Sequence, residues 1–224
     1  MKEKINEIKK IMLGHIPINI SIVVITPLSS TFYKLCKRLD IKEKYDNGFF
    51  ENCIFRLNYE EDKRGILILS PQGIASKDII ELFSNINILF FGLAGSLNKK
   101  YEIGSFVEVI LAEDEYGEIS KLNAIGKKEM VKCGYSPCLL GEIEKKYCEF
   151  ARNENCDVVD METTYCAKTA IERNNRFVSL LLISDIPKVI NFWELSDIER
   201  NKLKEGRKDA INEIINYINI LIKE

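Results

Sequence analysis

Three predicted strand ends carry residues whose types suit the binding and chemistry of a small molecule. Residues 92–96 (GLAGS) end one apolar segment, residues 158–163 (VVDMET) follow a second, and residues 182–185 (LISD) end a third. Ligands of parallel α/β sheets bind beyond the carboxyl ends of the strands. Glycine lets a ligand approach the backbone, and a carboxylate offers two acceptor oxygens. Together these segments predict a ligand site that contains carboxyl groups.

Apolar segments of strand length alternate with helical segments along the whole chain. This alternation predicts one domain over residues 1–224, a three-layer αβα fold with a mixed, largely parallel central sheet. Ser196 and Glu199 form a capping-box pattern before a long amphipathic C-terminal helix. The charged tract 113–118 predicts a surface turn. The expected strands are 18–25, 54–59, 65–70, 86–92, 106–112, 156–160 and 177–183. The other expected helices are a surface helix at the N-terminus, a helix that contains Ile79, Ile80 and Phe83, and helices over 32–39, 141–152 and 161–173.

Composition excludes several classes of protein. The chain has 224 residues, is 46% hydrophobic and 29% charged, and has a formal net charge of −2 without an arginine cluster. A nucleic-acid partner is therefore not expected, and neither is a disordered chain. Glu3 and Glu7 do not suit a signal peptide, and no apolar run approaches the ~20 residues that span a bilayer. We expect a cytoplasmic protein without a membrane partner.

The cysteines and the single histidine exclude further kinds of site and mechanism. The seven cysteines are irregularly spaced and include no C-x-x-C pair, which indicates free, mostly buried thiols in a reducing compartment. His15 is the only histidine, so a multi-histidine metal site and a Ser-His-Asp mechanism are not expected. Glycine-rich phosphate motifs are absent as well. The sequence predicts neither a metal nor a cofactor.

Read in chain order, these segments resemble the purine nucleoside phosphorylase and nucleosidase superfamily, which includes uridine phosphorylase and methylthioadenosine nucleosidase. The resemblance rests on short motifs between residues 65 and 185, and it implies the superfamily fold and cleavage of an N-glycosidic bond. The motifs are SPQGIASKDII from Ser70, FFGLAGSL, EIGSFVEV from Glu102, VVDMET and LLISD.

The resemblance also implies roles for individual residues. Glu162 is expected to accept hydrogen bonds from the ribose 2′ and 3′ hydroxyls, with Met161 packed against the sugar and Asp160 beside it. Asp185 is expected to protonate or hydrogen-bond the departing base, with Ser184 orienting its carboxyl group. An acid that works near neutral pH needs a pKa raised by burial, which a position after a core strand can supply. The end where water or phosphate attacks is expected to be lined by Gly95 and Ser96.

The attacking end departs from the superfamily pattern. Residues 26–31 (TPLSST) hold neither the first-loop arginine of phosphorylases nor the glutamate of nucleosidases, and residues 89–91 (LFF) supply no arginine before the glycine turn. Residues 137–140 (PCLL) replace the usual base-stacking phenylalanine. Without an arginine, the two negative charges of a phosphate dianion would be poorly balanced. Hydrolysis is therefore expected rather than phosphorolysis, although phosphate stays a possible partner.

Several alternatives stay open. The attacking water could be held by Ser29, Thr31 or Ser96, or a neighbouring subunit of a homo-oligomer could supply the missing group. The chain could also be a nucleoside-binding relative without turnover, or an unrelated flavodoxin-like regulator, against which the absence of a phosphate-cradling loop counts.

Each site residue also has a plain structural interpretation. Asp160 or Glu162 could stabilise a helix N-terminus through the helix dipole. Residues 184–185 and 94–96 could be simple turns, and Met161 could be a core residue.

Overall fold

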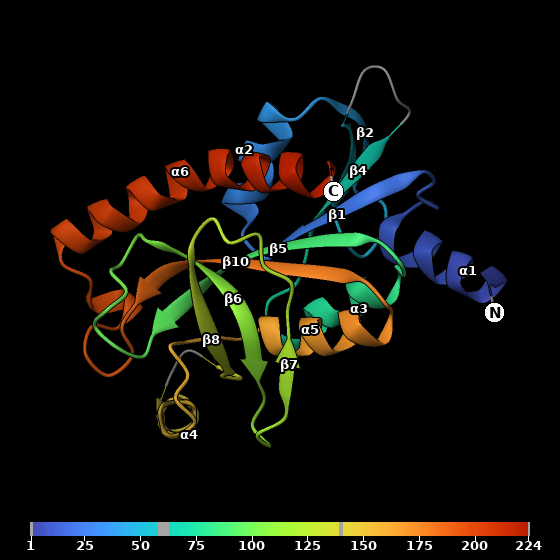
Figure 1. Ribbon diagram of the computed structural model, residues 1–224. Helices are drawn as coiled ribbons and strands as arrows, with labels where there is room; N and C mark the ends of the chain where they lie inside the picture. The colour runs from blue at the N-terminus through green and yellow to red at the C-terminus, as the bar shows by residue number, and fades with distance from the viewer. Residues whose placement is uncertain (1, 58–62, 139–140, 224) are drawn as a thin grey trace.

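One ten-stranded mixed sheet forms the centre of the chain (Figure 1). The computed structural model describes residues 2–57, 63–138 and 141–223. The strands are β1 (Ile20–Thr26), β2 (Ile41–Tyr45), β3 (Asn52–Arg56), β4 (Arg64–Leu69), β5 (Asn87–Ser96), β6 (Phe106–Glu113), β7 (Ile119–Lys121), β8 (Glu129–Tyr135), β9 (Val158–Asp160) and β10 (Arg176–Asp185). The helices are α1 (Lys2–Leu13), α2 (Ser29–Arg38), α3 (Lys77–Glu81), α4 (Gly141–Asn153), α5 (Thr163–Glu172) and α6 (Asp197–Leu221), with short 3₁₀ turns η1 (Gly73–Ser76) and η2 (Phe192–Glu194).

The four strands β4, β1, β5 and β10 lie side by side and run parallel. Successive side chains of a strand point to opposite faces of the sheet, so a strand buried on both faces is continuously apolar. In β5, Ile88 and Phe90 enter one hydrophobic core, while Leu89 and Phe91 enter the other. This arrangement explains why the most apolar segments of the sequence are the central strands.

Helices cover both faces of the sheet. Buried side chains of α2 and α6 share one core with the sheet, and those of α3 and α5 share the other; Figure 1 shows the two groups on opposite sides of β5 and β10. The predicted αβα arrangement is confirmed. No described helix has the length and apolar character needed to cross a bilayer.

The long helix α6 begins as its sequence predicts. The Glu199 backbone N–H donates to Ser196 Oγ at 3.3 Å, and the Ser196 backbone N–H donates to a Glu199 carboxylate oxygen at 2.7 Å. Both bonds satisfy N–H groups that a helix start leaves without intrahelical partners. The apolar stripe then packs Ile211, Ile214 and Ile218 into the core it shares with α2.

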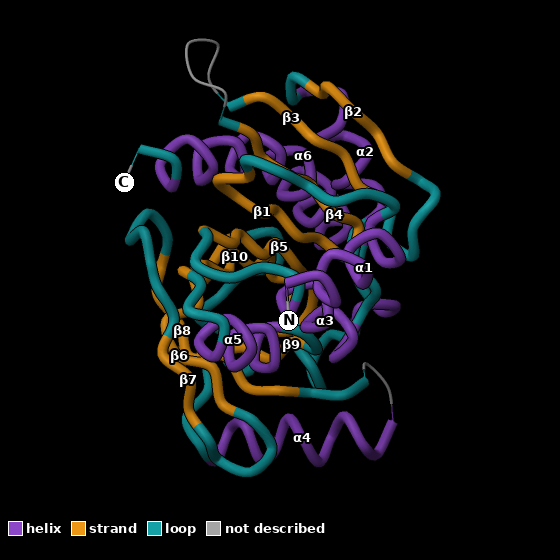
Figure 2. The backbone as a smooth tube through the Cα atoms, turned by 90° about the vertical axis from the view of Figure 1, so that its right-hand side faces the viewer, coloured by secondary structure: helices purple, strands orange, loops and turns teal. Residues whose placement is uncertain are grey.

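Part of the sheet closes on itself, which the sequence did not predict. Strand β5 pairs in parallel with β10 and, at Gly95 and Ser96, antiparallel with β9. The pairings β9–β8, β8–β6 and β6–β10 complete the ring. Figure 2 shows β6, β7 and β8 on the side of the molecule away from β2 and β3. Closure brings the carboxyl ends of β5, β9 and β10 together.

Several element boundaries differ from the predictions. The strand expected over 54–59 is β3, which ends at Arg56, and Tyr59 lies outside the described residues. The helix expected to include Phe83 ends at Glu81, and that expected from Met161 begins at Thr163. Strands β2, β7 and β8 were not predicted, because lysine and glutamate interrupt their apolar alternation.

The tract 113–118 does form the turn between β6 and β7, but its first two residues are buried. Glu113 is 2% exposed and pairs with Lys132, and Asp114 is 1% exposed and pairs with Lys168. Buried carboxylates need such partners to offset the loss of hydration. The charge run therefore fixes β6 against β8 and α5 in addition to turning the chain.

Candidate active site

A cavity of about 360 Å³ opens where the carboxyl ends of β5, β9 and β10 converge. Its lining includes Leu93, Ala94 and Gly95 from β5, Val159 and Asp160 from β9, and Ser184 and Asp185 from β10. Met161, Glu162 and residues of the loop after β1 complete this part of the wall. The three strand ends singled out in the sequence therefore contribute to one cavity. Glu162 and Asp185 both line it.

Glu162 is held at the start of α5 by a loop far away in the sequence. Its side chain is buried, and its Oε1 accepts a hydrogen bond from the Gly73 backbone N–H at 2.6 Å. Gly73 has a φ of +75°, a conformation that suits glycine. Burial raises the pKa of Glu162, the nearby Asp160 carboxylate raises it further, and the Gly73 N–H opposes both effects. Glu162 is thus a fixed acceptor group at the cavity wall.

Asp160 lines the cavity, but α5 engages its carboxylate. Both carboxylate oxygens lie 3.1 Å from the Thr163 backbone N–H, and the Thr163 hydroxyl donates to Oδ2. The Cys133 thiol adds a contact at 3.5 Å. These bonds agree with the interpretation that Asp160 stabilises a helix N-terminus. Burial raises the pKa of Asp160, while the bonds from Thr163 and Cys133 oppose that shift.

Asp185 and Ser184 form a hydrogen-bonded pair at the end of β10. The Ser184 hydroxyl lies 2.6 Å from Asp185 Oδ1 and 3.2 Å from the Ala94 carbonyl oxygen. Burial raises the pKa of Asp185, and the hydrogen bond from Ser184 opposes this shift. A carboxyl group with a raised pKa keeps its proton closer to neutral pH. The pair can therefore present a proton donor to the cavity.

Gly95 is required by the packing of the chain around this pair. A Cβ atom there would lie 2.7 Å from Pro187 Cγ and 3.5 Å from Asp185 Oδ1. The first distance is shorter than van der Waals contact, so a larger residue would displace Pro187. The close approach predicted at this glycine thus involves Pro187 of the same chain. Met161, which was also predicted, lines the cavity directly.

Three predicted residues do not line this cavity. Ser96 is fully buried, pairs with Val158 in the sheet, and donates its hydroxyl to the Asn98 carbonyl oxygen. Ser29 is exposed at the first turn of α2, and Thr31 is buried within that helix. Because α2 begins directly after Leu28, the first loop contributes Pro27 and Leu28 to the lining instead. The expectation that these three hydroxyls hold the attacking water has no support in this geometry.

The cavity also contains residues that sequence reasoning missed. They include Gln72, Glu144, Phe192, Trp193 and Arg207. Burial raises the pKa of Glu144, and the Asp185 carboxyl adds to the shift, so these two groups are close enough to interact. Gln72 lies within the motif SPQGIASKDII, which had suggested no role for it. No motif marks the other four positions, because they come from helices and loops whose placement depends on the tertiary fold. Of the segment 137–140, residues 139 and 140 lie outside the described residues.

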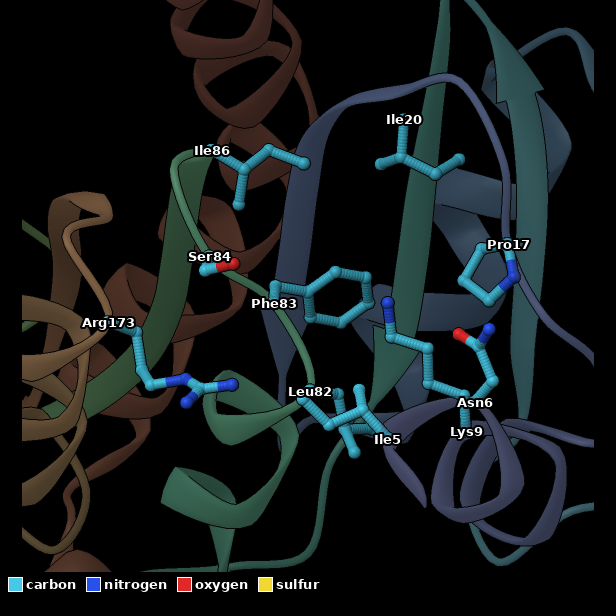
Figure 3. A pocket seen from close by; sticks show the side chains of 10 residues that line it. All are labelled: Ile5, Asn6, Lys9, Pro17, Ile20, Leu82, Phe83, Ser84, Ile86 and Arg173. Carbon is cyan, nitrogen blue, oxygen red and sulfur yellow. The ribbon is translucent and has the colours of Figure 1, made fainter. Parts of the chain in front are cut away.

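A second cavity, of about 320 Å³, lies at the opposite, amino-terminal ends of β1 and β5 (Figure 3). Lys9 Nζ lies 5.2 Å from the centre of the Phe83 ring there. Arg173 also lines this cavity, whose described lining includes no carboxylate. None of the predicted site residues lies in it. Within the described ranges, no group of three or more histidine, cysteine, aspartate or glutamate side chains is arranged to hold a metal ion. The predicted site residues that line one of these two cavities all line the one at the carboxyl ends of the strands.

Solved structures resemble the chain closely in fold. No protein-family model and no curated protein sequence matches it. The 5′-methylthioadenosine/S-adenosylhomocysteine nucleosidase of Campylobacter jejuni has a TM-score of 0.72 and 15% identity, over 89% of this chain and 98% of that one. A futalosine hydrolase mutant of Helicobacter pylori has a TM-score of 0.70 and 14% identity, over 89% of this chain and 97% of that one. The S-adenosylhomocysteine nucleosidase of Streptococcus pyogenes has a TM-score of 0.66 and 15% identity, over 89% and 96%.

These likenesses cover nearly the whole chain at low sequence identity. They confirm the resemblance inferred from the motifs as a resemblance of fold. The chain therefore shares the fold of these solved nucleosidase and hydrolase structures.

Proposed function

We propose that the protein hydrolyses the N-glycosidic bond of a nucleoside or nucleoside-like metabolite. The observation that carries the proposal is that Glu162 and Asp185, from different strand ends, line one cavity. Ser184 supports Asp185 by a hydrogen bond, and Gly73 supports Glu162. The nucleosidase fold of the structural neighbours agrees with this assignment.

In this proposal the two carboxyl groups act on opposite parts of the substrate. Glu162 accepts hydrogen bonds from the 2′ and 3′ hydroxyls, because a carboxylate presents two oxygens to a vicinal diol. Met161 packs against the sugar. Cleavage places positive charge on the sugar and negative charge on the base, and a positioned acid lowers the barrier by protonating the base as it leaves. Asp185 is the proton donor, since burial raises its pKa.

Water is the preferred nucleophile. The described lining includes four acids and one cation, so it is net negative when the acids are ionised and then repels a phosphate dianion. The acids are Glu144, Asp160, Glu162 and Asp185, and the cation is Arg207. The first loop contributes only Pro27 and Leu28, neither of which is cationic. Water, which is neutral, meets no such repulsion. Water attacks the anomeric carbon as the bond to the base nitrogen breaks and the proton of Asp185 passes to the base. The attacking water loses one proton to solvent, and Asp185 takes up a proton from solvent afterwards, so the products are a free sugar and a free base.

A binding protein of the same fold is the second candidate. One observation favours it: neither Pro27 nor Leu28, the first-loop residues at the cavity, can act as a base toward water. A nucleoside panel incubated with and without phosphate, with free base detected by chromatography, separates the two functions. The proposal expects free base without phosphate, and Asp185→Asn is expected to lower turnover by at least ~100-fold. Nucleoside binding without free base after long incubation would leave the second candidate.

A further inference from the structure

Two cysteines from different elements face each other on the side of the sheet that α2 covers. Cys36 lies on α2 and Cys53 is the second residue of β3, and their sulfur atoms are 3.5 Å apart. Both are free thiols; Cys53 is fully buried, whereas Cys36 is half-buried. Figure 2 shows α2 beside the part of the sheet that holds β2 and β3. Neither thiol lines the cavity at the carboxyl ends of the strands, so the proposed glycosidic chemistry uses neither.

The fold fixes the approach of the two sulfur atoms from both sides. Cys36 packs against the hydrophobic core to which Cys53 belongs. Strand β3 lies between two strands, because Cys53 is paired with Lys44 of β2 on one side and with Leu67 of β4 on the other. Hydrogen bonds to both neighbours hold β3 in the sheet. A disulfide bond of about 2.05 Å therefore requires the two sulfur atoms to approach by about 1.5 Å.

A cation lies near the same thiols. Side chains directly opposite each other in antiparallel strands share a face of the sheet, so Lys44 lies on the face that carries Cys53. Lys44 Nζ lies 3.0 Å from Glu51 Oε1 and 5.4 Å from the centre of the Tyr33 ring, one helical turn before Cys36. The Tyr33 hydroxyl donates to the other Glu51 oxygen at 2.6 Å. These contacts hold the Lys44 ammonium group beside α2.

The two thiols differ in acidity. The hydrogen bond with the Cys53 thiol lowers the pKa of Cys36, burial raises it and Lys44 lowers it, so the net shift is downward. The pKa of Cys53 is raised by the bond to Cys36 and by burial. Burial also raises the pKa of four other thiols, those of Cys133, Cys148, Cys156 and Cys166. Cys36 thus combines partial exposure with a lowered pKa, which is typical of a reactive thiol.

We propose that Cys36 and Cys53 form a redox-active dithiol, which hydrogen peroxide converts into an internal disulfide. The Cys36 thiolate attacks one peroxide oxygen, the O–O bond breaks, and Cys36 becomes a sulfenic acid. The hydroxide that leaves takes up the proton that the Cys36 thiol lost. The Cys53 sulfur then attacks the sulfenic sulfur, and the hydroxyl group departs as water with the Cys53 proton. Two thiols give up two electrons, and the peroxide becomes two molecules of water.

Proximity favours the internal disulfide over other fates of the sulfenic acid. The Cys53 thiol is already in contact with the reacting sulfur, which gives it a high effective concentration there. A disulfide can be reduced again by thiol exchange, whereas further oxidation to a sulfinic acid is irreversible in most proteins. The pair lies outside the proposed active site, so its reaction is independent of the proposed function.

Mass spectrometry of the whole chain tests the proposal. Reduced wild-type protein is treated with hydrogen peroxide in metal-free buffer, its remaining thiols are blocked with N-ethylmaleimide, and it is digested without reductant. The expected product is a peptide pair linked through Cys36 and Cys53, in a chain lighter by two hydrogen atoms. Dithiothreitol is expected to restore both thiols. Absence of this link, or a link from Cys36 to a second chain in its place, overturns the proposal.

Single substitutions separate the roles of the two cysteines. In Cys53→Ala, Cys36 should remain a sulfenic acid, and dimedone should label it at least ~10-fold more than in wild-type protein. In Cys36→Ala, Cys53 should stay unmodified, because it is fully buried. Circular dichroism checks that each variant is folded. Equal dimedone labelling of Cys36 in wild type and Cys53→Ala would show that Cys53 does not resolve the sulfenic acid, which overturns the dithiol.

Lys44→Gln tests the electrostatic part of the proposal. The substitution removes a positive charge that favours the thiolate, so alkylation of Cys36 by iodoacetamide is expected to slow by at least ~2-fold. Lys42→Gln is the matched control, because it removes the same charge from the same strand at a residue that pairs with Asp40. This control is expected to leave the rate unchanged. Equal rates in Lys44→Gln and wild type overturn the role of Lys44 in activating the thiol.

Discussion

The Ser184 hydroxyl donates a hydrogen bond to Asp185 Oδ1 over 2.6 Å, at the point where β10 reaches the cavity. Burial raises the pKa of Asp185, and this hydrogen bond opposes the shift. The bond also fixes the orientation of the carboxyl group, because Ser184 lies within 3.2 Å of the Ala94 carbonyl in the neighbouring strand. Ser184 thereby influences both where the proton is held and the pH at which it is lost.

Removal of the Ser184 hydroxyl is expected to change the pH profile of base release. The activity of a general acid falls as the pH rises through its pKa. Ser184→Ala removes the group that lowers the pKa of Asp185, so the alkaline limb of the kcat profile should move to higher pH. Ser105→Ala, which removes a hydroxyl that bonds the Glu102 carbonyl outside this site, serves as control. An alkaline limb that stays in place or moves to lower pH would count against the assignment of the proton donor.

Glu162 is expected to recognise the sugar diol. Glu162→Gln should lower turnover of a ribonucleoside by at least ~100-fold, because an amide presents one acceptor oxygen to the diol where the carboxyl group presents two. Wild-type protein should also prefer ribonucleosides to their 2′-deoxy analogues by at least ~10-fold, and the substitution should shrink that preference. Steady-state kinetics on both substrates gives the two ratios. Glu172→Gln, an exposed glutamate of the same helix, is the control. An undiminished preference in Glu162→Gln would show that another group reads the diol.

Gly95 is expected to be intolerant of even one methyl group. In Gly95→Ala the new Cβ would lie 2.7 Å from Pro187 Cγ, and overpacking of this kind typically lowers the free energy of unfolding by about 1–3 kcal/mol. Chemical denaturation measures the loss. Pro187→Ala in the same chain removes the clashing atoms and should restore most of the stability. If the double variant is no more stable than Gly95→Ala, the contact with Pro187 is not the reason for the glycine.

The buried carboxyl groups of Asp160 and Glu162 are expected to make stability depend on pH. In the folded state both pKa values lie above those of the unfolded chain. At a pH between the unfolded and the folded values, the folded state therefore binds more protons than the unfolded state. Their contribution to stability is therefore complete below about pH 4, the unfolded pKa, and is lost as the pH rises through the folded pKa values. Chemical denaturation of the wild type and of Glu162→Gln at several pH values in this range measures how much the Glu162 carboxyl group contributes to the pH dependence of stability. The variant should lose less stability with rising pH, and identical slopes would contradict the assigned shift.

The sequence predicted the part of the site that depends on strand ends. Continuous apolar strands indicated a parallel sheet, and the carboxyl ends of such strands share one edge, so Glu162 and Asp185 were expected near each other. Both residues do line one cavity. The reason differs, however, because β9 runs antiparallel to β5, and the closure of the sheet brings the two residues together. The structural role of Asp160 could not be separated from a ligand role, because a carboxylate directly after a strand suits both a helix cap and a ligand contact.

Other parts of the site depend on tertiary placement that no local pattern encodes. Arg207 sits on an amphipathic helix whose periodicity gives the buried face but not the point where the helix passes a cavity. Ser29 and Thr31 were expected at the attacking end, but α2 begins at Ser29, and only Leu28 and Pro27 before it reach the cavity. Strand β8 was not predicted, because glutamate and lysine interrupt its apolar pattern, and the antiparallel pairing of β9 with β5 leaves no mark in the sequence.

Base release in oxygen-18-labelled water tests the central proposal most directly. Wild-type protein is incubated with adenosine, inosine, 5′-methylthioadenosine and uridine in phosphate-free buffer, and the released sugar is analysed by mass spectrometry. The proposal predicts free base together with a sugar that carries one labelled oxygen at its anomeric carbon, and loss of both products in Asp185→Asn. Absence of free base from every nucleoside, or a sugar phosphate formed only when phosphate is added, would contradict hydrolysis.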